Sequence, residues 1–324
     1  MKINLGIIGA GLIGKKRALT LPRGMNLKVI CDVDSLKGKQ FAKEFDCQYE
    51  RDWKKVVKNK DIEAILVCVT NNFLSLIAIS AIEEKKHVLI EKPGGISAND
   101  IRRTLDAHKK NPGVVMYGYN HRLHPAIQKA KKLVTSKKYG KVLFIRAKYG
   151  HGGRVGYEKE WRFKKEISGG GELIDQGCHL IDLVNYFCGP MDQLTGYLGT
   201  MFWKTNLEDT AFFILKNKNQ MASLSVSCVE WKNIFQFEVM LQTAKIQIDG
   251  LGKSYGQEKL TLYKMKPKMG PPDVEEFMFT EEDKSWEKEN ELFYKKIIDS
   301  DFSDTSILDS LYVLDIIGEL YKIK

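Results

Sequence analysis

The chain has 324 residues, enough for two domains of common size, and its 43% apolar and 28% charged residues form an ordinary globular composition. No apolar run approaches the roughly 20 residues that a membrane-spanning helix needs. The apolar start is broken by Gly6 and Gly9 and runs into Lys15-Lys16-Arg17 without a cleavage-like site, which argues against a secretory leader. We therefore expect a soluble, cytoplasmic protein.

The chain carries 51 Lys and Arg against 41 Asp and Glu, a net charge of +10. Such a surplus suits nucleic acid, a membrane surface or an anionic small molecule. A basic surface that is merely solvated explains it equally well, because the lysines occur in scattered pairs and no nucleic-acid motif accompanies them. We expect neither nucleic acid nor a membrane as a partner, whereas an anionic substrate such as a sugar nucleotide is compatible with the charge.

Six cysteines are present, and no two of them form a Cys-x-x-Cys pair. Most of them lie in apolar surroundings, which is typical of buried thiols in a reducing compartment. No zinc-ligand spacing is found, and we predict no metal site.

The first 120 residues alternate short apolar runs with segments of helical character. The predicted strands cover residues 3–8, 27–31, 65–69, 87–90 and 114–117. The predicted helices cover residues 12–21, 36–44, 74–84 and 99–110. This alternation with continuous apolar strands favours an α/β fold, a doubly wound parallel sheet of the Rossmann type that forms a dinucleotide-binding domain over residues 1–119.

The pattern changes after Tyr119. Strands are predicted at residues 143–149, 209–215, 221–229 and 235–241, with a hairpin turn over 217–220. A Pro/Gly loop covers 267–272, and helical spacing runs from 304 to 322. We expect residues 120–324 to form an α+β domain with an open, largely antiparallel sheet for substrate binding and oligomerisation, whose C-terminal helix packs back on the first domain.

Gly9-Ala10-Gly11-Leu12-Ile13-Gly14 matches the pattern G-x-G-x-x-G between a predicted strand and a predicted helix. In this context Gly9 permits the tight turn, Gly11 lets a pyrophosphate approach the backbone, and Gly14 allows close helix–strand packing. The free N–H groups and dipole at the helix N-terminus favour phosphate. We therefore assign Gly9, Gly11, Leu12, Ile13 and Gly14 to cofactor binding.

Asp32 ends the second predicted strand, eighteen residues after Gly14, where an acidic side chain is expected to meet the adenosine ribose hydroxyls. A carboxylate there repels a 2′-phosphate, and no Arg or Lys follows until Lys37. The sequence therefore predicts NAD in preference to NADP. The alternative is that Asp32 only caps the next turn.

Thr70-Asn71-Asn72 follows the strand at 65–69, at the carboxyl end where ligands bind in such sheets. We expect all three residues to contact the cofactor, although Asn72 can equally cap the next helix. Glu91-Lys92-Pro93 follows the strand at 87–90, and Pro93 prevents simple continuation of that strand. Lys92 would place a cation beside the nicotinamide and the substrate hydroxyl. The alternative is an ordinary exposed turn lysine.

Three consecutive glycines, Gly169 to Gly171, precede a segment that is predicted to be helical up to Gly189-Pro190. They allow the backbone to approach a ligand or another element closely. Asp175, His179 and Asp182 fall at positions i, i+4 and i+7, on one face of a helix. A solvated polar stripe with a chance histidine explains the same pattern.

Together, these segments resemble the Gfo/Idh/MocA oxidoreductase family over nearly the whole chain. The resemblance rests on the glycine fingerprint, on Glu91-Lys92-Pro93, and on the glycine triplet followed by Asp175, His179 and Asp182. Asn120-His121-Arg122 and Trp161-Arg162 are similar to segments near the active site in that family. One departure is local: many members have Thr-Pro-Asn and then a His, whereas this chain has Thr70-Asn71-Asn72 with Ser75 at the position of the His.

The resemblance implies an NAD-dependent dehydrogenase that acts on a secondary hydroxyl of a sugar, cyclic polyol or sugar nucleotide. It implies His179 as the general base, Asp175 as the residue that orients the hydroxyl or the base, and Asp182 as the group that fixes the His179 tautomer. Lys92 would hydrogen-bond the reacting oxygen, a role that suits an ammonium. Glu91 and Asn120 are assigned to the cofactor. The candidate substrate residues are Lys92, Arg122, Tyr149, Arg154, Trp161, Arg162, Asp175 and His179.

The family's open sheet often builds dimers or tetramers, so a homodimer or homotetramer is expected. Two other functions remain open at this point. One is an NAD-dependent glycoside hydrolase that oxidises its sugar transiently and regenerates bound NAD in each turnover. The other is a non-catalytic NAD or sugar sensor, against which the intact Lys92, Asp175 and His179 speak.

Overall fold

In this computed structural model, residues 2–303 and 305–323 are described, and they form two compact units. Unit 1 comprises residues up to Tyr119, Glu166–Gly169 and Trp286–Leu314. Unit 2 comprises Asn120–Lys165, Gly170–Ser285 and the residues from Asp315 on. Each unit is therefore assembled from separate stretches of chain. No helix among the described residues is long and apolar enough to cross a membrane.

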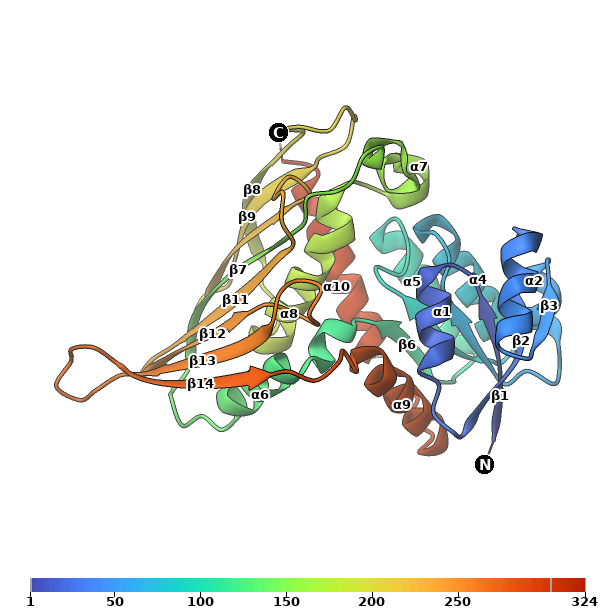
Figure 1. Ribbon diagram of the computed structural model, residues 1–324, viewed down its shortest axis with the longest axis horizontal. Coiled ribbons are helices and arrows are strands. Elements are labelled where there is room, and N and C mark those ends of the chain that lie inside the picture. Colours follow the sequence, from blue (N-terminus) through green and yellow to red (C-terminus); the bar gives the residue numbers. More distant parts are fainter. Residues whose placement is uncertain (1, 304, 324) are drawn as a thin grey trace. The chain divides into compact units, whose positions relative to one another are not determined.

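Unit 1 contains a six-stranded parallel sheet in the order β3-β2-β1-β4-β5-β6 (Figure 1). Its strands are β1 (Ile3–Ile8), β2 (Met25–Cys31), β3 (Gln48–Glu50), β4 (Ala64–Val67), β5 (His87–Glu91) and β6 (Val115–Gly118). Its helices include α1 (Leu12–Leu19), α2 (Ser35–Glu44), α3 (Trp53–Lys58), α4 (Asn71–Glu83) and α5 (Ala98–Lys110). The predicted Rossmann sheet is confirmed. Strand order reverses between β1 and β4, and ligands bind at such a switch point.

A late segment of the chain completes the core of unit 1. Helix α9 (Ser285–Ile298) brings Phe293 and Ile297 into the same apolar cluster as Ile3, Leu5 and Leu66. Phe293 and Leu5 are fully buried. Burying an aromatic or aliphatic side chain of this kind contributes about 1.5–3 kcal/mol, so α9 is an integral part of this unit.

Unit 2 contains an eight-stranded mixed sheet in the order β14-β13-β12-β11-β7-β10-β9-β8. Its strands are β7 (Val142–Gly150), β8 (Gln193–Gly199), β9 (Thr210–Lys216), β10 (Met221–Ser227), β11 (Ile234–Leu241), β12 (Ala244–Asp249), β13 (Glu258–Lys264) and β14 (Asp273–Phe279). The predicted hairpin is confirmed as the antiparallel pair β9–β10. Among the described strands of this sheet, β7 and β10 pair in parallel and the other neighbours are antiparallel, so the prediction of a largely antiparallel sheet is also confirmed.

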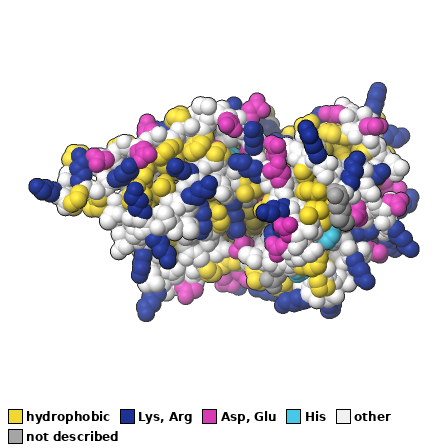
Figure 2. All heavy atoms as spheres, turned by 90° about the horizontal axis from the view of Figure 1, so that it is seen from below, with side chains coloured by type: hydrophobic (Ala, Val, Ile, Leu, Met, Phe, Trp, Pro, Cys, Tyr) yellow, Lys and Arg dark blue, Asp and Glu magenta, His cyan; other side chains and the backbone are white. Residues whose placement is uncertain are grey.

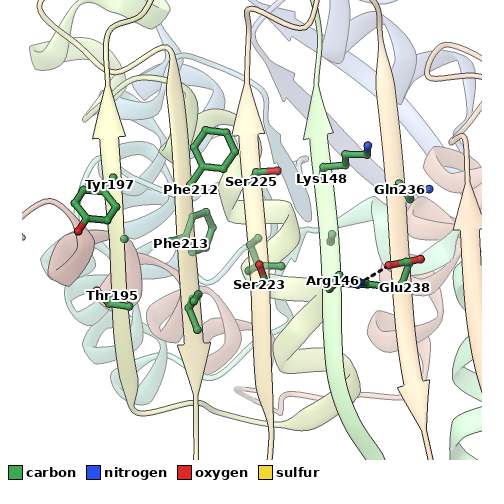
Figure 3. Close-up of a pocket in the computed structure, with 14 residues that line it drawn as sticks. Arg146, Lys148, Thr195, Tyr197, Phe212, Phe213, Ser223, Ser225, Gln236 and Glu238 are labelled. Atoms are coloured by element: carbon green, nitrogen blue, oxygen red, sulfur yellow. Dashed lines mark hydrogen bonds and ion pairs between the residues drawn. The ribbon is translucent and has the colours of Figure 1, made fainter.

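Helices cover one face of the unit 2 sheet (Figure 1). Helix α8 (Cys178–Cys188) packs on β7, and α6 (Pro125–Thr135) packs on β12, β13 and β14. The strands alternate accordingly: along β9, Ala211, Phe213 and Leu215 are buried, whereas Phe212 and Ile214 are exposed. The exposed positions form a shallow hollow on the other face of the sheet (Figure 3).

The six cysteines form no disulfide among the described residues. Burial raises the pKa of Cys31 to about 12 and that of Cys47 to about 11, so both are protonated thiols at neutral pH. The Lys and Arg side chains on the face drawn in Figure 2 are scattered among acidic and apolar ones.

Candidate active site

The glycine fingerprint turns from β1 into α1. Gly9 has φ +110°, and a Cβ there would lie 2.1 Å from the Cys68 carbonyl oxygen. A Cβ on Gly14 would lie 1.9 Å from the Gly9 oxygen. Among the described residues, no atom beyond the adjacent backbone lies within 4 Å of the Cβ position of Gly11, so internal packing does not demand glycine there. An open surface at a helix N-terminus fits a pyrophosphate that must approach the backbone.

The residues around the fingerprint are also open to a ligand. Leu12 is 72% exposed at the start of α1, and Ile13 is half-buried. The Asp32 carboxylate accepts hydrogen bonds from the N–H of Ala10, at 2.7 Å, and from that of Asp34, at 2.8 Å. Asp34, not Asp32, caps α2, by accepting from the N–H groups of Leu36 and Lys37. Asp32 thus lies directly beside the glycine turn.

Thr70 is the N-cap residue of α4, and its hydroxyl donates to Asn72 Oδ1 at 2.8 Å. The alternative that Asn72 caps this helix is therefore wrong, because the cap lies two residues earlier. Asn71 is buried, and its side-chain amide donates to the Ser168 carbonyl at 2.9 Å within unit 1. Ser75 hydrogen-bonds the Asp100 carbonyl and Thr104, so it joins α4 to α5.

Glu91 ends β5 as a buried side chain, and its carboxylate binds the guanidinium of Arg17 at 2.6–2.8 Å. A cofactor contact by this carboxylate therefore has to share it with Arg17. Lys92 follows as a half-buried residue, and the Lys92–Pro93 peptide is cis. Lys92 belongs to unit 1, whereas Asp175 and His179 belong to unit 2.

Two of the three consecutive glycines are required by close packing within unit 2. A Cβ on Gly170 would lie 1.8 Å from the Tyr321 hydroxyl, and one on Gly171 would lie 2.0 Å from the Glu208 carbonyl oxygen. Glu208 also accepts hydrogen bonds from the N–H groups of Gly171 and Leu173 and from the Tyr321 hydroxyl. The backbone here approaches other protein elements, which is one of the two uses that the sequence predicted.

The sequence predicted one continuous α-helix after the glycines, but the structure divides this segment into two parts. Leu173–Gly177 forms a π-helical turn, η4, and α8 starts at Cys178. The wider turn changes the direction of Asp175 relative to the residues of α8, because a π turn holds more residues than an α turn. His179 and Asp182 both contact the 3₁₀ turn η1 (Asn120–Leu123), whereas Asp175 pairs with Arg162. π turns inside helices often occur at functional sites.

His179 is 4% exposed, and its ring stacks on the ring of His121, with centroids 3.7 Å apart and planes inclined by 16°. The ring of Tyr149 meets both imidazoles edge-on, at 5.3 Å from His121 and 6.1 Å from His179. Burial raises the pKa of Tyr149 well above its ordinary value, and the adjacent Tyr255 adds to this effect. Tyr149 is therefore a neutral phenol that helps to fix the orientation of the His179 ring.

Asp175 forms an ion pair with Arg162, whose Nε lies 3.0 Å from Asp175 Oδ2. Burial opposes the charge on Arg162, but Asp175, Tyr157 and Glu160 together outweigh it and raise the pKa of the guanidinium. Arg162 also pairs with Glu160 and lies over the ring of Trp161, 4.9 Å from its centroid. Glu160, Trp161 and Arg162 are half-buried, and they form a cluster at the start of the 3₁₀ turn η3 (Trp161–Phe163), which we call the Arg162 cluster.

The remaining predicted residues are already engaged within unit 2. Arg122 binds both carboxylate oxygens of Asp182, at 2.5 and 2.8 Å, and packs on Tyr186. The buried Asn120 donates to the Ser285 hydroxyl at 2.9 Å, and its Oδ1 lies 3.2 Å from His121 Nδ1. The exposed Arg154 pairs with Glu160 at 2.5 Å. These contacts position η1 and the Arg162 cluster. Each of these side chains therefore already uses part of its hydrogen-bonding capacity within the protein.

Sequence reasoning did not identify several polar residues near Asp175. The half-buried His151, whose pKa is lowered by partial burial, lies 3.5 Å from Glu172 and also contacts Tyr157. His121 was named only as part of a motif, although it supports the ring of His179. Glu172 adjoins the predicted glycine triplet, which is a signal that could have found it.

Models of one protein family match both units. The "Oxidoreductase family, NAD-binding Rossmann fold" matches residues 3–119, and the "GFO/IDH/MocA C-terminal domain" matches residues 127–247. Levoglucosan dehydrogenase of Pseudarthrobacter phenanthrenivorans is 29% identical over 211 residues, which are 61% of this chain and 54% of that protein. The 2,7-anhydro-N-acetylneuraminate hydratase of Escherichia coli is 26% identical over 245 residues, 72% of this chain and 63% of that protein. The matched segments thus span about half to two thirds of these relatives.

Inositol 2-dehydrogenase of Salmonella paratyphi B is 23% identical over 155 residues, 46% of each chain. Among solved structures, that of levoglucosan dehydrogenase in complex with NADH superposes with a TM-score of 0.89, at 20% identity, over 99% of this chain and 96% of that one. The fold of both units is therefore that of the same group of proteins. The chain belongs to the Gfo/Idh/MocA oxidoreductase family, and its first unit is an NAD-binding Rossmann domain.

Proposed function

We propose that this protein is an NAD-dependent dehydrogenase that acts on a secondary hydroxyl of a sugar, cyclic polyol or sugar nucleotide. The observation that carries the proposal is the fixed, buried imidazole of His179 beside the acidic π turn that holds Asp175. An imidazole is suited to proton transfer at neutral pH, because its ordinary pKa is near 6.5. The names of relatives that include levoglucosan dehydrogenase and inositol 2-dehydrogenase support the substrate class.

In this proposal, His179 accepts the proton of the reacting hydroxyl as the general base. The stack on His121 keeps the ring in one orientation, so little reorganisation is needed when the proton moves. Lys92 donates a hydrogen bond to the same oxygen and stabilises its developing negative charge. Asp175 orients the substrate hydroxyl, and its ion pair with Arg162 keeps its carboxylate in place.

The residues around the π turn suit a polyhydroxylated or anionic substrate. The half-buried Trp161 offers aromatic surface of the kind that packs on sugar faces, whereas Tyr149, 4% exposed, packs on His121 and His179 instead. Arg162 and Arg122 provide guanidinium groups that recognise carboxylate or phosphate, although each already binds an acidic side chain. Because those guanidiniums are largely neutralised, we favour a neutral sugar or polyol ring over a doubly charged sugar nucleotide.

The residues of unit 1 fit NAD. The open Cβ position of Gly11 leaves room for the pyrophosphate at the N-terminus of α1, and Asp32 lies at that turn to accept the ribose hydroxyls. Val33 and Leu36 next to Asp32 are 75% and 81% exposed, and an adenine ring is a suitable partner for such apolar surface. When bound, NAD supplies the hydride acceptor, and the side chains of the protein orient the reactants.

Asp32→Ala is expected to weaken NAD binding by about ten- to a hundredfold, since a charge-assisted hydrogen bond contributes about 1.5–3 kcal/mol. Binding of NADP should improve relative to NAD, because the carboxylate that repels a 2′-phosphate is gone. Titration of both cofactors by fluorescence measures this ratio. Asp34→Ala is the matched control, because that carboxylate caps α2 and ion-pairs with Lys37. Equal NAD affinity of Asp32→Ala and wild type would contradict the cofactor assignment.

The substrate class is tested with a panel of sugars, anhydro-sugars, inositols and nucleotide sugars, with NAD and NADP, by the absorbance of the reduced cofactor. A turnover that depends on His179 supports the proposal. A protein that binds NAD but neither forms NADH nor consumes any of the compounds would be the sensor.

The hydratase among the relatives favours one second candidate, a redox-neutral reaction on a sugar. In such a reaction, bound NAD is regenerated within each turnover, as in an NAD-dependent glycoside hydrolase. The two candidates differ in one measurement. A dehydrogenase accumulates one NADH for each product, whereas a redox-neutral enzyme consumes its sugar without a net change in NADH.

We also propose that the exposed face of the unit 2 sheet binds a second copy of this chain. Tyr197 of β8 and Phe212 of β9 project from this face as shown in Figure 3, and they are 81% and 59% exposed. Ile214, also on β9, is 43% exposed. Beside them, Arg146 and Glu238 form an ion pair across β7 and β11. Apolar side chains bordered by a balanced charge pair suit a self-complementary interface.

Phe212→Glu is expected to convert an oligomer into a 37.0 kDa monomer, because it places a charge in the apolar centre of this face. Size-exclusion chromatography with light scattering measures the mass. Phe202→Glu is the matched control, since Phe202 is 54% exposed but lies outside the sheet. A wild-type monomer, or a Phe212→Glu variant of unchanged mass, would show that another surface or no surface assembles.

A further inference from the structure

The guanidinium of Arg17 is completely buried in unit 1 and joins three segments. It comes from α1, the helix that follows the glycine fingerprint, and binds Glu91 at the end of β5. On its other side it binds Glu289 at 2.5 Å and Asn290 at 3.2 Å, both from α9. Despite the burial, these carboxylates raise the pKa of Arg17 above its ordinary value, so the charge is permanent.

Neighbouring groups pack closely around this guanidinium. Its centre lies 4.7 Å from the ring of Trp286 in a cation–π contact. A Cβ on Gly118, at the end of β6, would lie only 2.7 Å from Arg17 Nη2. Asn290 in turn donates to the Arg17 carbonyl, so side chain and backbone of Arg17 are both held by α9.

A second contact holds the other end of the Glu91-Lys92-Pro93 turn. The fully buried Ser310, on α10 (Thr305–Leu320), donates from its hydroxyl to the Pro93 carbonyl at 2.9 Å. Lys92 therefore stands between two anchored neighbours: Glu91 is held by Arg17 and Pro93 is held by Ser310. Both anchors come from segments far away in the sequence.

We propose that Arg17 and Ser310 are positioning residues that hold the turn around Lys92 and tie it to the pyrophosphate-binding helix. This inference rests on the proposed function of Lys92 as the residue that binds the reacting oxygen. It assigns α9 and the first half of α10 a part in the reaction, although the proposed function assigns no residue of either helix to substrate or cofactor. A displacement of about 1 Å at a reacting group can lower a rate by as much as a hundredfold.

Ser310→Ala is the most direct variant, because it removes one hydroxyl and leaves no buried charge unpaired. We expect kcat to fall about tenfold while the KM for NAD changes less than twofold, since the pyrophosphate turn itself is intact. Glu91→Gln should give a fall of similar size, because the weaker pairing with Arg17 frees the other end of the turn. Arg17→Met leaves two buried carboxylates without their cation, so its failure to fold would not be informative.

Ser75→Ala is the matched control. Ser75 is also a buried serine of unit 1 whose hydroxyl bonds a backbone carbonyl, that of Asp100, at 2.8 Å. The two alanine variants should lose similar thermal stability, but only Ser310→Ala should lose kcat.

Lys92 itself is then probed without any assay of activity. Competitive acetylation with acetic anhydride, quantified by mass spectrometry, reports the reactivity of each lysine in the folded protein. Ser310→Ala and Glu91→Gln should change the labelling of Lys92 at least twofold and leave that of Lys86 unchanged, whereas Ser75→Ala should alter neither.

The outcomes separate the two proposals. The positioning role would be overturned if Ser310→Ala left the labelling of Lys92 unchanged and had the same kcat as the Ser75→Ala control. If labelling changes as expected but Lys92→Ala retains full turnover, the positioning of Lys92 stands and its proposed role in the reaction fails.

Discussion

His179→Ala is expected to lower kcat by about 10²- to 10⁴-fold and to leave the dissociation constant of NAD unchanged. The substitution removes the general base but no residue of the glycine turn, which lies in the other unit. Hydroxide or water then has to accept the proton from the hydroxyl. Steady-state kinetics gives kcat, and fluorescence titration gives NAD affinity separately.

Lys92→Ala is the companion variant and should lower kcat by a similar factor, because an ammonium no longer stabilises the oxygen as its charge develops. Lys218→Ala, in the β9–β10 turn, controls for the loss of a lysine remote from the glycine turn and from Asp175. Near-normal turnover of both His179→Ala and Lys92→Ala would refute the mechanism. A loss of NAD binding in His179→Ala would indicate a structural cause instead.

Glu208→Ala is expected to destabilise unit 2 by roughly 3–5 kcal/mol. Its carboxylate accepts hydrogen bonds from Gly171 at 3.0 Å, Leu173 at 3.1 Å and Tyr321 at 2.7 Å, and the substitution leaves these donors buried without this acceptor. The glycine triplet and the π turn should lose their structure first. Activity should therefore be lost at urea concentrations below the midpoint of unfolding. Urea unfolding followed by circular dichroism measures the loss.

Glu319→Ala is the control for this experiment, because its ion pair with Lys322 is exposed and should contribute less than about 1 kcal/mol. A pH series adds a second test. Burial raises the pKa of Glu208 above 4.5, so the stabilisation from its bound proton is complete below pH 4.5 and is lost as the pH rises through the folded-state value. Glu208→Gln should therefore gain stability relative to wild type as the pH rises above 4.5, and a constant difference would contradict the shift.

The fold of unit 1 could be predicted from the sequence because its signals are local. Each buried strand is a continuous apolar run, as in β4, where all four residues are buried. The glycine turn and Asp32 lie within a few residues of the elements they connect. The strand β14 was missed for the opposite reason: most of its residues are exposed, and it carries no strong apolar alternation.

The site was predictable by residue type but not by geometry. Asp175 and His179 could be named, yet the π turn between them changes the period that the helical-face argument assumed. The network of Arg17 joins residues 74 and 272 positions apart, and no local pattern indicates such a contact. The partner of Glu208, Tyr321, is 113 residues away. Pairings over such distances arise from tertiary packing, which periodicity does not encode.

The apolar cluster that includes both Ile3 and Phe293 has a consequence for biosynthesis. A ribosome that has made only residues 1–119 has synthesised every strand of the Rossmann sheet but not the helix that covers part of its core. The nascent chain must then keep that apolar surface exposed while some 170 further residues are translated, at about 5–20 residues per second. During this time we expect chaperones to bind the incomplete chain. For the same reason, a fragment that ends at Tyr119 is expected to aggregate.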